Sequence, residues 1–346
     1  MSRYGIYVQP ETGSKPFYLD DSGCQMLSKI GSFPFRYNST YDFTEPPGMW
    51  NYDKGIKSWV TNVNGLDSYN AFVIVKKGSH AAFQGRLTGV VSNWTKRIWL
   101  DGNTLCVDAS TGDASAWNDD PYGGFFQYEV FGTPKRTASD SNYGIQLSGM
   151  NNVTTITDLS KLGYCVWAGD IYSPGWDGVY IPGYDIGNES RYTLYVRPKN
   201  GEAVMMKYKN IIKTKNATTL QIILFDHMPD FYNKPKFGIE IRNKNGVVTY
   251  TSKYAPLMGG QVLTNKSGST WYSRPFFNLG NYGTYVSSIK NKYYDLAAMG
   301  LYVSGNYYDV RHMTNVSMGW MGDMWTDHGE INGVFNTHCI DGDLYL

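Results

Sequence analysis

Charged residues are scarce in this chain of 346 residues. Only 18% are Asp, Glu, Lys or Arg, and the 31 basic residues nearly balance the 30 acidic ones. Proteins that bind nucleic acid usually carry a basic stripe or patch, and the sequence has none, so we expect no nucleic-acid partner. No apolar run approaches the roughly 20 residues that a membrane-spanning helix needs, so we also expect no membrane span.

Cysteine is rare and the N-terminal segment has no long apolar run. Cys24, Cys106, Cys165 and Cys339 are far apart and form no C-x-x-C pair, the spacing typical of zinc and redox sites. We therefore expect free thiols that pack as small apolar groups. The start of the sequence lacks the apolar core of a signal peptide, which predicts synthesis in a cytosol without a cleaved signal peptide.

The motifs of common enzymes are absent as well. The sequence contains no G-x-G-x-x-G, no phosphate-binding G-x-x-x-x-G-K-[ST], no H-E-x-x-H and no G-x-S-x-G. Nothing in the sequence places one of its five histidines beside a nucleophile. We predict that the protein uses no cofactor and is not an enzyme.

One group of metal-ligand types lies near the C-terminus. It consists of Asp323, Asp327, His328, Glu330, His338 and Cys339. Histidine, cysteine and carboxylate all bind zinc, but this spacing matches no familiar site. We predict no metal and interpret the group as a surface loop.

A Met- and Trp-rich segment precedes that group. Its members are Met313, Met318, Trp320, Met321, Met324 and Trp325. These side chains fill irregular cores and also build adaptable contact surfaces. We favour packing in the core or at a subunit interface over a ligand-binding cup.

Tyrosine, tryptophan and glycine are abundant, with 29, 10 and 38 residues. These are residues of strands and tight turns. The best candidate for a short helix is the segment 287–301. The predicted fold class is mainly β, with two or three antiparallel β-sandwich or barrel-like domains and few short helices.

Three stretches have the pattern of a β-hairpin. Alternating apolar residues, a turn containing glycine and a second apolar run occur in 236–250, 4–19 and 192–206. Either an old duplication or ordinary hairpins of a β protein would explain the likeness. The irregular spacing of the three copies argues against a solenoid or a propeller array.

Composition suggests three regions. We predict an N-terminal β-rich domain over 1–187, a hairpin-rich β domain over 188–265, and a C-terminal β region over 266–346 that is separate or completes the second domain. The segment 175–190, dense in Gly, Pro and Asp, is the expected linker or domain edge. The polar segment 108–124 is expected to be a long loop or a crossing between two sheets.

Aromatic and acidic residues alternate in the segment 167–185. A flat aromatic ring can contact the apolar face of a sugar while carboxylates bind its hydroxyls. Two suitably spaced carboxylates, such as Asp170 and Asp177, would even allow glycan hydrolysis. The alternative is a structural loop that covers the end of a sheet. The candidate glycan contacts are Trp167, Tyr172, Trp176, Asp177, Tyr180 and Tyr184.

The hairpin sequences FGIEIRNKNGVVTYTSKYAPL and YGIYVQPETGSKPFYLDDSGCQML resemble the openings of small β-rich proteins in the tail modules of tailed bacteriophages and prophages. The shared residues are structural, so the resemblance transfers no functional residue. It implies a virion tail protein made in the bacterial cytoplasm. It also implies a homo-oligomer, a trimer or higher symmetric assembly, that contacts other tail proteins and a host surface polysaccharide or outer-membrane protein.

The first functional hypothesis is therefore a fibre, tip or receptor-binding subunit without catalytic activity, whose N-terminal region attaches to the tail. A second hypothesis is a purely structural collar, connector or capsid-decoration protein. A third is a polysaccharide depolymerase. The long parallel β-helix repeats frequent in depolymerising tailspikes are not visible in the sequence.

Overall fold

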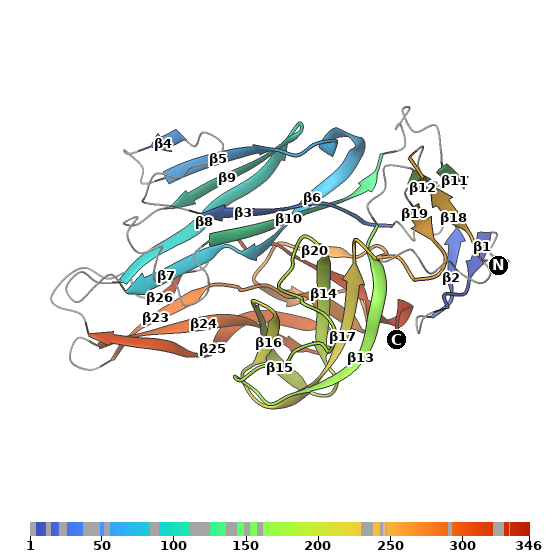
Figure 1. Cartoon of the computed structure of the whole chain (residues 1–346). Coiled ribbons are helices and arrows are strands. Elements are labelled where there is room, and N and C mark those ends of the chain that lie inside the picture. The colour runs from blue at the N-terminus through green and yellow to red at the C-terminus, as the bar shows by residue number, and fades with distance from the viewer. Residues whose placement is uncertain are drawn as a thin grey trace.

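A computed structural model describes most of the chain. The described residues are 5–11, 15–20, 26–36, 49–51, 56–83, 90–110, 125–135, 144–148, 153–157, 162–229, 238–242, 245–246, 248–289, 293–320, 329–331 and 333–346. They form strands, joined by turns and by two short 3-10 turns, η2 (Leu66–Ser68) and η4 (Gly342–Leu344), and contain no α-helix. The predicted mainly β, antiparallel class is therefore confirmed (Figure 1).

Four larger sheets contain most of the strands. The five-stranded sheet consists of β4 (Met49–Asn51), β5 (Ile56–Asn62), β9 (Thr104–Ser110), β8 (Val90–Asp101) and β7 (Ser79–Phe83). The three-stranded sheet consists of β3 (Ser28–Arg36), β10 (Phe125–Pro134) and β6 (Tyr69–Lys77). The segment 108–124 was expected to be a long loop or a crossing between two sheets. Residues 108–110 belong to β9, and the chain then passes from the five-stranded to the three-stranded sheet through residues 111–124, which lie outside the described part.

The other two large sheets come from the second half of the chain. The six-stranded sheet consists of β13 (Tyr164–Ser173), β17 (Thr218–Asp226), β14 (Tyr192–Pro198), β22 (Pro275–Asn278), β27 (Thr337–Asp341) and β20 (Gln261–Leu263). The seven-stranded sheet consists of β16 (Ile211–Thr214), β15 (Glu202–Tyr208), β24 (Tyr293–Ser304), β23 (Thr284–Ile289), β26 (Gly329–Ile331), β25 (Tyr307–Trp320) and β21 (Ser267–Ser269).

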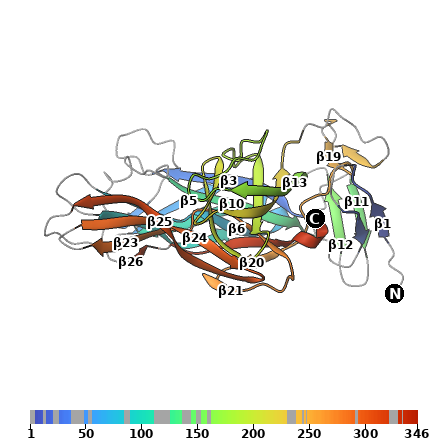
Figure 2. The ribbon, with the colours of Figure 1, turned by 90° about the horizontal axis from the view of Figure 1, so that it is seen from below.

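Three two-stranded sheets lie together at one end of the molecule (Figures 1 and 2). They are the pairs β1 (Gly5–Val8) with β2 (Phe17–Asp20), β11 (Gly144–Ser148) with β12 (Val153–Thr157), and β18 (Glu240–Arg242) with β19 (Val248–Thr251). Val8, Phe17 and Tyr250 insert into the neighbouring core, so these ribbons cover one edge of the larger sheets.

The large sheets pack face to face. One apolar core lies between the five- and three-stranded sheets, a second between the three- and six-stranded sheets, and a third between the six- and seven-stranded sheets. The six-stranded sheet is buried on both faces: on β14, Tyr195 enters the second core, whereas Leu194 and Val196 enter the third. Each fully buried side chain of this size contributes about 1.5–3 kcal/mol to stability.

The stack closes into a ring because β23 and β26 of the seven-stranded sheet contact β7 and β8 of the five-stranded sheet. The result is a propeller-like arrangement in which each of the four large sheets is one blade. The predicted sandwich domains are therefore wrong, and so is the exclusion of a propeller. The blades have unequal numbers of strands, and cross-blade packing needs only apolar faces, which leave no fixed repeat in the sequence.

Two of the three predicted hairpins are confirmed. β1 pairs with β2, and β18 pairs with β19 across a turn in which Gly246 has φ 77°. The third is wrong: β14 pairs with β17 and β22, while β15 pairs with β16 and β24. The turn at 198–201 instead connects one blade to the next.

The predicted helix at 287–301 is also wrong. Its described residues, 287–289 and 293–301, belong to β23 and β24, which pair antiparallel from Thr284–Ala298 to Ile289–Tyr293. Between β24 and β25 the register shifts twice, at Leu296/Ala297 and at Ala298/Met299. Such bulges break the period of two, so the segment imitates a helical pattern.

Strands from all three predicted domain ranges share the six-stranded sheet: β13 from 1–187, β14 and β17 from 188–265, and β22 and β27 from 266–346. The division into three domains stays a prediction. Within the described part of the chain, no helix is long and apolar enough to cross a membrane.

The three cysteines that the structure describes are packed free thiols, as expected. Cys106, Cys165 and Cys339 are free and buried, and each belongs to a strand that faces an apolar core. Burial raises the pKa of the Cys339 thiol to about 12, so this thiol stays protonated at neutral pH and acts as an apolar packing group.

Candidate functional site

A cleft of about 860 Å³ opens between the three-stranded sheet and the connections of the six- and seven-stranded sheets. This volume lies in the range of roughly 300–1,000 Å³ typical of small-ligand sites. Most of the residues that line it are polar or charged. The lining residues are Ser32, Pro34, Lys76, Lys77, Gln127, Asp185, Gly187, Asn188, Glu189, Ser190, Lys207, Tyr208, Lys209, Asn210, Gly280 and Asn281.

Glycine allows the blades to approach closely at the bottom of this cleft. A Cβ atom on Gly280 would lie only 2.5 Å from the carbonyl oxygen of Lys76, and the neighbouring Asn281 N–H donates to that same oxygen at 2.6 Å. The chain after β22 is thereby attached to the end of β6. This contact fixes the cleft floor to two blades at once.

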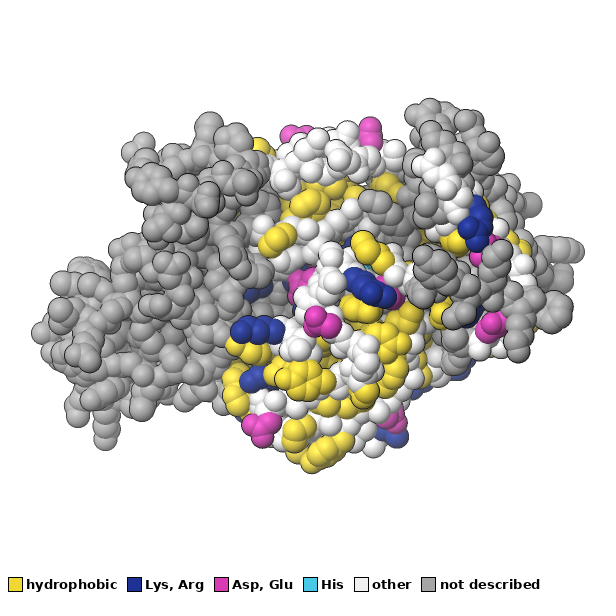
Figure 3. All heavy atoms as spheres, in the orientation of Figure 1, with side chains coloured by type: hydrophobic (Ala, Val, Ile, Leu, Met, Phe, Trp, Pro, Cys, Tyr) yellow, Lys and Arg dark blue, Asp and Glu magenta, His cyan; other side chains and the backbone are white. Residues whose placement is uncertain are grey.

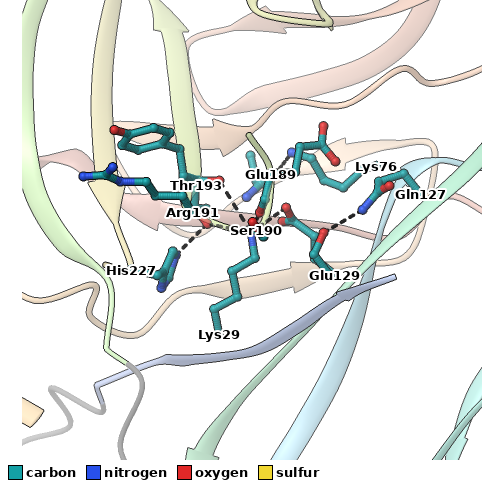
Figure 4. Close-up of polar contacts among 12 residues, drawn as sticks. Lys29, Lys76, Gln127, Glu129, Glu189, Ser190, Arg191, Thr193 and His227 are labelled. Atoms are coloured by element: carbon teal, nitrogen blue, oxygen red, sulfur yellow. Dashed lines mark hydrogen bonds and ion pairs between the residues drawn. The ribbon is translucent and has the colours of Figure 1, made fainter. Parts of the chain in front are cut away.

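A buried ion pair lies beneath the floor (Figure 4). The Nζ of Lys29, on β3, lies 2.7 Å from Oε1 of Glu129, on β10, and the two side chains are only 2% and 1% exposed. Lys29 also donates to the backbone carbonyl of Glu189. Because a buried charge is stable only when it is compensated, this pair ties the segment 185–190 to the three-stranded sheet.

Glu189 also pairs with Lys207, which lies at the end of β15. Burial alone would raise the pKa of the Glu189 carboxyl, but the ammonium groups of Lys207, Lys76 and Lys29 outweigh this effect and hold it below its usual value. Glu189 is therefore a carboxylate at neutral pH, and the Lys207–Glu189 pair connects a third blade to the cleft.

Lys76 differs from Lys29 and Lys207, which are each paired with a glutamate. Its ammonium donates to Oδ1 of Asn278 and to the backbone carbonyl of Leu279, and among the described residues it has no ion-pair partner. Burial lowers its pKa to about 8, with Glu129 and Glu189 acting in the opposite direction. The group is mainly protonated at pH 7, but it titrates close to neutrality.

One side of the cleft has an aromatic and a cationic residue, Tyr208 and Lys209. Lys213 lies with Nζ 4.0 Å from the ring centroid of Trp176 and 5.1 Å from that of Tyr208. Next to Tyr208, Lys209 has φ 51°, a left-handed conformation that is unfavourable for most residues other than glycine. Lys209 and Asn210 form the two-residue turn between β15 and β16, and hairpin turns of this length use such a conformation.

Among the predicted glycan contacts, Trp167 and Tyr184 have structural roles. Trp167 is partly buried against the third core. The Tyr184 hydroxyl donates to the carbonyl of Val166 at 3.2 Å, and its ring packs edge-on against Tyr192. Tyr184 lies in the connection after β13, in line with the structural loop that we considered as the alternative. Trp167 lies on β13 itself, so residues 167–173 form a strand and are not part of that loop.

The remaining predicted contacts differ in exposure. Trp176 packs partly against Met206 and its neighbours, while Tyr172 and Tyr180 are 63% and 59% exposed. Asp177 is also exposed. Burial lowers the pKa of Lys213, and the Asp177 carboxylate acts in the opposite direction with a smaller effect. The segment nevertheless supplies part of the cleft, because its end at Asp185 lines the opening.

Asp170 is occupied by neighbours. Its carboxylate accepts from Lys199 Nζ at 2.6 Å and from Gln221 Nε2 at 3.2 Å. The hydrogen bond from Lys199 is the main cause that holds the Asp170 pKa below its usual value. A carboxylate in this state is poorly suited to donate a proton.

The C-terminal metal-ligand types do not converge where the structure describes them. His338 stacks on Phe72 and bonds to the Tyr195 hydroxyl through Nδ1 at 2.8 Å, whereas Cys339 belongs to the third core. Adjacent residues of a strand point to opposite faces, so these two are not partners, and they lie in buried β27 rather than in the expected surface loop. Asp323, Asp327 and His328 lie outside the described residues, as does the side chain of Glu330.

The Met- and Trp-rich segment is described only in part. Met313 is 1% exposed and packs with Met206 and Ala298, which confirms the core interpretation for this residue. Met318 and Trp320 lie on β25. The described residues do not include Met321, Met324 or Trp325.

The sequence interpretation missed the cleft itself. Its floor comes from β3, β6, β10, β15 and the segment 185–190, which are far apart in the chain. One signal was present: Glu129 stands inside the apolar run FFQYEVF, and Lys76 ends the apolar run AFVIV. A lone charge between residues that are buried on both faces indicates a paired or functional group.

Charges on the described surface are interspersed. On the face shown in Figure 3, basic and acidic side chains lie beside one another among uncharged atoms. The fold and the cleft thus define a mainly β, propeller-like protein, with a cleft between its blades that polar and charged residues line.

The chain belongs to a family of unknown function, DUF6453, whose model matches residues 5–318. No curated protein and no solved structure matches this chain.

Proposed function

We propose that this protein is a non-enzymatic structural component of a bacteriophage tail, a fibre, tip or receptor-binding subunit, that mediates assembly and attachment to the host surface. One observation supports it most: a cleft of about 860 Å³, lined mainly by polar and charged residues, lies beside a six-stranded sheet that is packed on both faces. Ligand-contacting segments on a rigid scaffold suit recognition of a surface molecule.

The proposal extends to location and partners. The protein would be made in the bacterial cytoplasm and act in the virion tail, where its N-terminal region would contact other tail proteins. The host partner would be a surface polysaccharide or an outer-membrane protein. The exposed rings of Tyr172 and Tyr180 would offer additional stacking surfaces for sugars.

Depolymerase activity is the less favoured alternative. Among the acids that we considered, Asp170 is held as a carboxylate by Lys199, and general-acid catalysis needs a carboxyl with a raised pKa. Incubation of the purified chain with host capsule or O-antigen is expected to release no reducing ends over hours. Release that is lost in Asp170→Asn or Asp177→Asn would contradict the non-enzymatic proposal.

Deletion of the gene in the phage or prophage that encodes the chain tests attachment against cement. We expect particles that assemble but do not adsorb to host cells, with adsorption restored by the wild-type gene. Particles that fall apart would instead support a collar, connector or decoration role. Intact particles with normal adsorption would refute both roles.

A further inference from the structure

Lys76 holds a positive charge in the cleft floor and has no ion-pair partner among the described residues. Lys76 is 4% exposed and lines the cleft, yet its two hydrogen bonds go to the amide oxygen of Asn278 and to a backbone carbonyl. An ammonium group has three donors, so one N–H remains for a ligand. Lys29 and Lys207, in contrast, are each paired with a glutamate.

The lining as a whole is cationic. Four lysines, Lys76, Lys77, Lys207 and Lys209, face two carboxylates, Asp185 and Glu189. The described lining therefore has an excess of two positive charges. In a cleft with low-dielectric walls such an excess attracts an anion more strongly than it would on an open surface.

The uncharged part of the lining suits a polyhydroxylated ligand. Hydroxyl and amide side chains donate and accept hydrogen bonds in the way that sugar hydroxyls require. Gln127 Nε2 donates to Ser32 Oγ at 2.6 Å, and Ser190 Oγ donates to Asn188 Oδ1 at 2.7 Å, so these groups are held in place before a ligand binds. The ring of Tyr208 adds an aromatic surface.

We propose that this cleft binds an acidic saccharide, with the carboxylate or phosphate group of the sugar against Lys76 and Lys209 and a sugar ring beside Tyr208. This inference rests on the proposed attachment function and specifies the chemistry of the receptor. Anionic groups of both kinds would be recognised through the same ammonium donors.

Isothermal titration calorimetry of the full chain tests the charge requirement. The probes are a trimer of galacturonic acid, an oligomer of glycerol phosphate and the neutral trisaccharide maltotriose. We expect one or both acidic probes to bind, with affinity that falls as salt rises, and maltotriose to bind at least about tenfold more weakly, the size of a charged hydrogen bond. The better acidic probe identifies the anion.

Variants assign the binding to the cleft. Lys209→Asn removes a charge but keeps a residue that tolerates a positive φ, so the turn should still fold, and we expect acidic-probe affinity to drop about two- to fivefold. Lys76→Gln should reduce it about tenfold or more. Lys96→Gln, at an exposed lysine on β8 outside the cleft lining, is the matched control and should change nothing.

The pH dependence gives a second readout that uses the galacturonate probe, because its carboxylate stays ionised. Lys76 faces Lys29 from β3, Glu129 from β10, Glu189 from the segment 185–190 and Lys207 from β15. Since the Lys76 pKa is about 8, its ammonium is present below that pH and lost above it. Affinity should therefore fall as pH rises through 8, and Lys76→Gln should flatten this slope.

The outcomes separate this inference from the proposed function. Equal binding of acidic and neutral probes, no binding of any probe by a chain that still attaches to host cells, or unchanged affinity in a folded Lys209→Asn protein would overturn the acidic-saccharide site and leave attachment standing. Acidic-probe binding by a protein whose deletion leaves adsorption normal would refute attachment and keep the site.

Discussion

At the scale of single residues, the most consequential feature is the burial of Lys29 with Glu129. Two charges removed from water lose several kcal/mol of hydration each, and their mutual attraction recovers this only while both are present. The pair lies between β3 and β10, and Lys29 also donates a hydrogen bond to the backbone carbonyl of Glu189. These contacts therefore hold the cleft segment 185–190 in a fixed position relative to the three-stranded sheet.

Glu129→Gln is expected to destabilise the protein strongly, because Lys29 would keep a buried charge without its partner. We expect the free energy of unfolding to fall by about 3–5 kcal/mol, measured by urea denaturation. The double variant Lys29→Met/Glu129→Leu removes both charges and should recover much of the loss. A cost below about 1 kcal/mol for the single variant would show that water solvates the pair.

At the scale of elements, β20 depends on the glycine that precedes it. Gly260 has φ 131°, and a Cβ there would lie 2.1 Å from Nε2 of His338 and 2.6 Å from the carbonyl oxygen of Cys339, both on β27. His338 is fixed in turn by Tyr195 and Phe72. Neither neighbour is able to yield without disturbing the β20–β27 pairing.

Gly260→Ala should therefore lower the free energy of unfolding by about 2–4 kcal/mol, from backbone strain and overpacking together. Gly201→Ala is the matched control, because Gly201 has φ 66° with nothing within 4 Å of the added Cβ. It should cost only about 1 kcal/mol. Thermal or urea unfolding of both variants measures the difference, and equal costs would show that β20 adapts.

Prediction from the sequence succeeded best for individual strands. Alternation of apolar residues gave the strands β1, β2, β18 and β19, and each of them pairs with its neighbour along the chain. β14 and β15 have the same local signals but pair with other strands. Local pattern fixes the backbone conformation, whereas pairing also depends on which faces must be covered.

At the scale of the whole molecule, the blades form a ring whose cleft receives residues from three of them. The resemblance to tail proteins predicts that copies of this chain associate further, because virion proteins usually form closed symmetric assemblies. Exposed apolar side chains such as Trp271, at 71% exposure, are available for such contacts.

Native mass spectrometry of the full-length protein at micromolar concentration is expected to show a trimer or a higher symmetric assembly. Dilution should dissociate it in a concentration-dependent way if the contacts are those of separately folded subunits. A monomer over the whole concentration range, confirmed by analytical ultracentrifugation, would contradict this expectation.

The sequence by itself determined the strand-rich class, the free thiols and the β1–β2 and β18–β19 hairpins. Each of these depends on composition or on neighbours along the chain. Only the tertiary structure decided the propeller-like ring, the partners of β14 and β15, and the cleft with Lys76 at its floor. These depend on residues that are far apart in sequence and meet through burial of both faces of a sheet, and apolar burial carries no direction from which a partner is predictable.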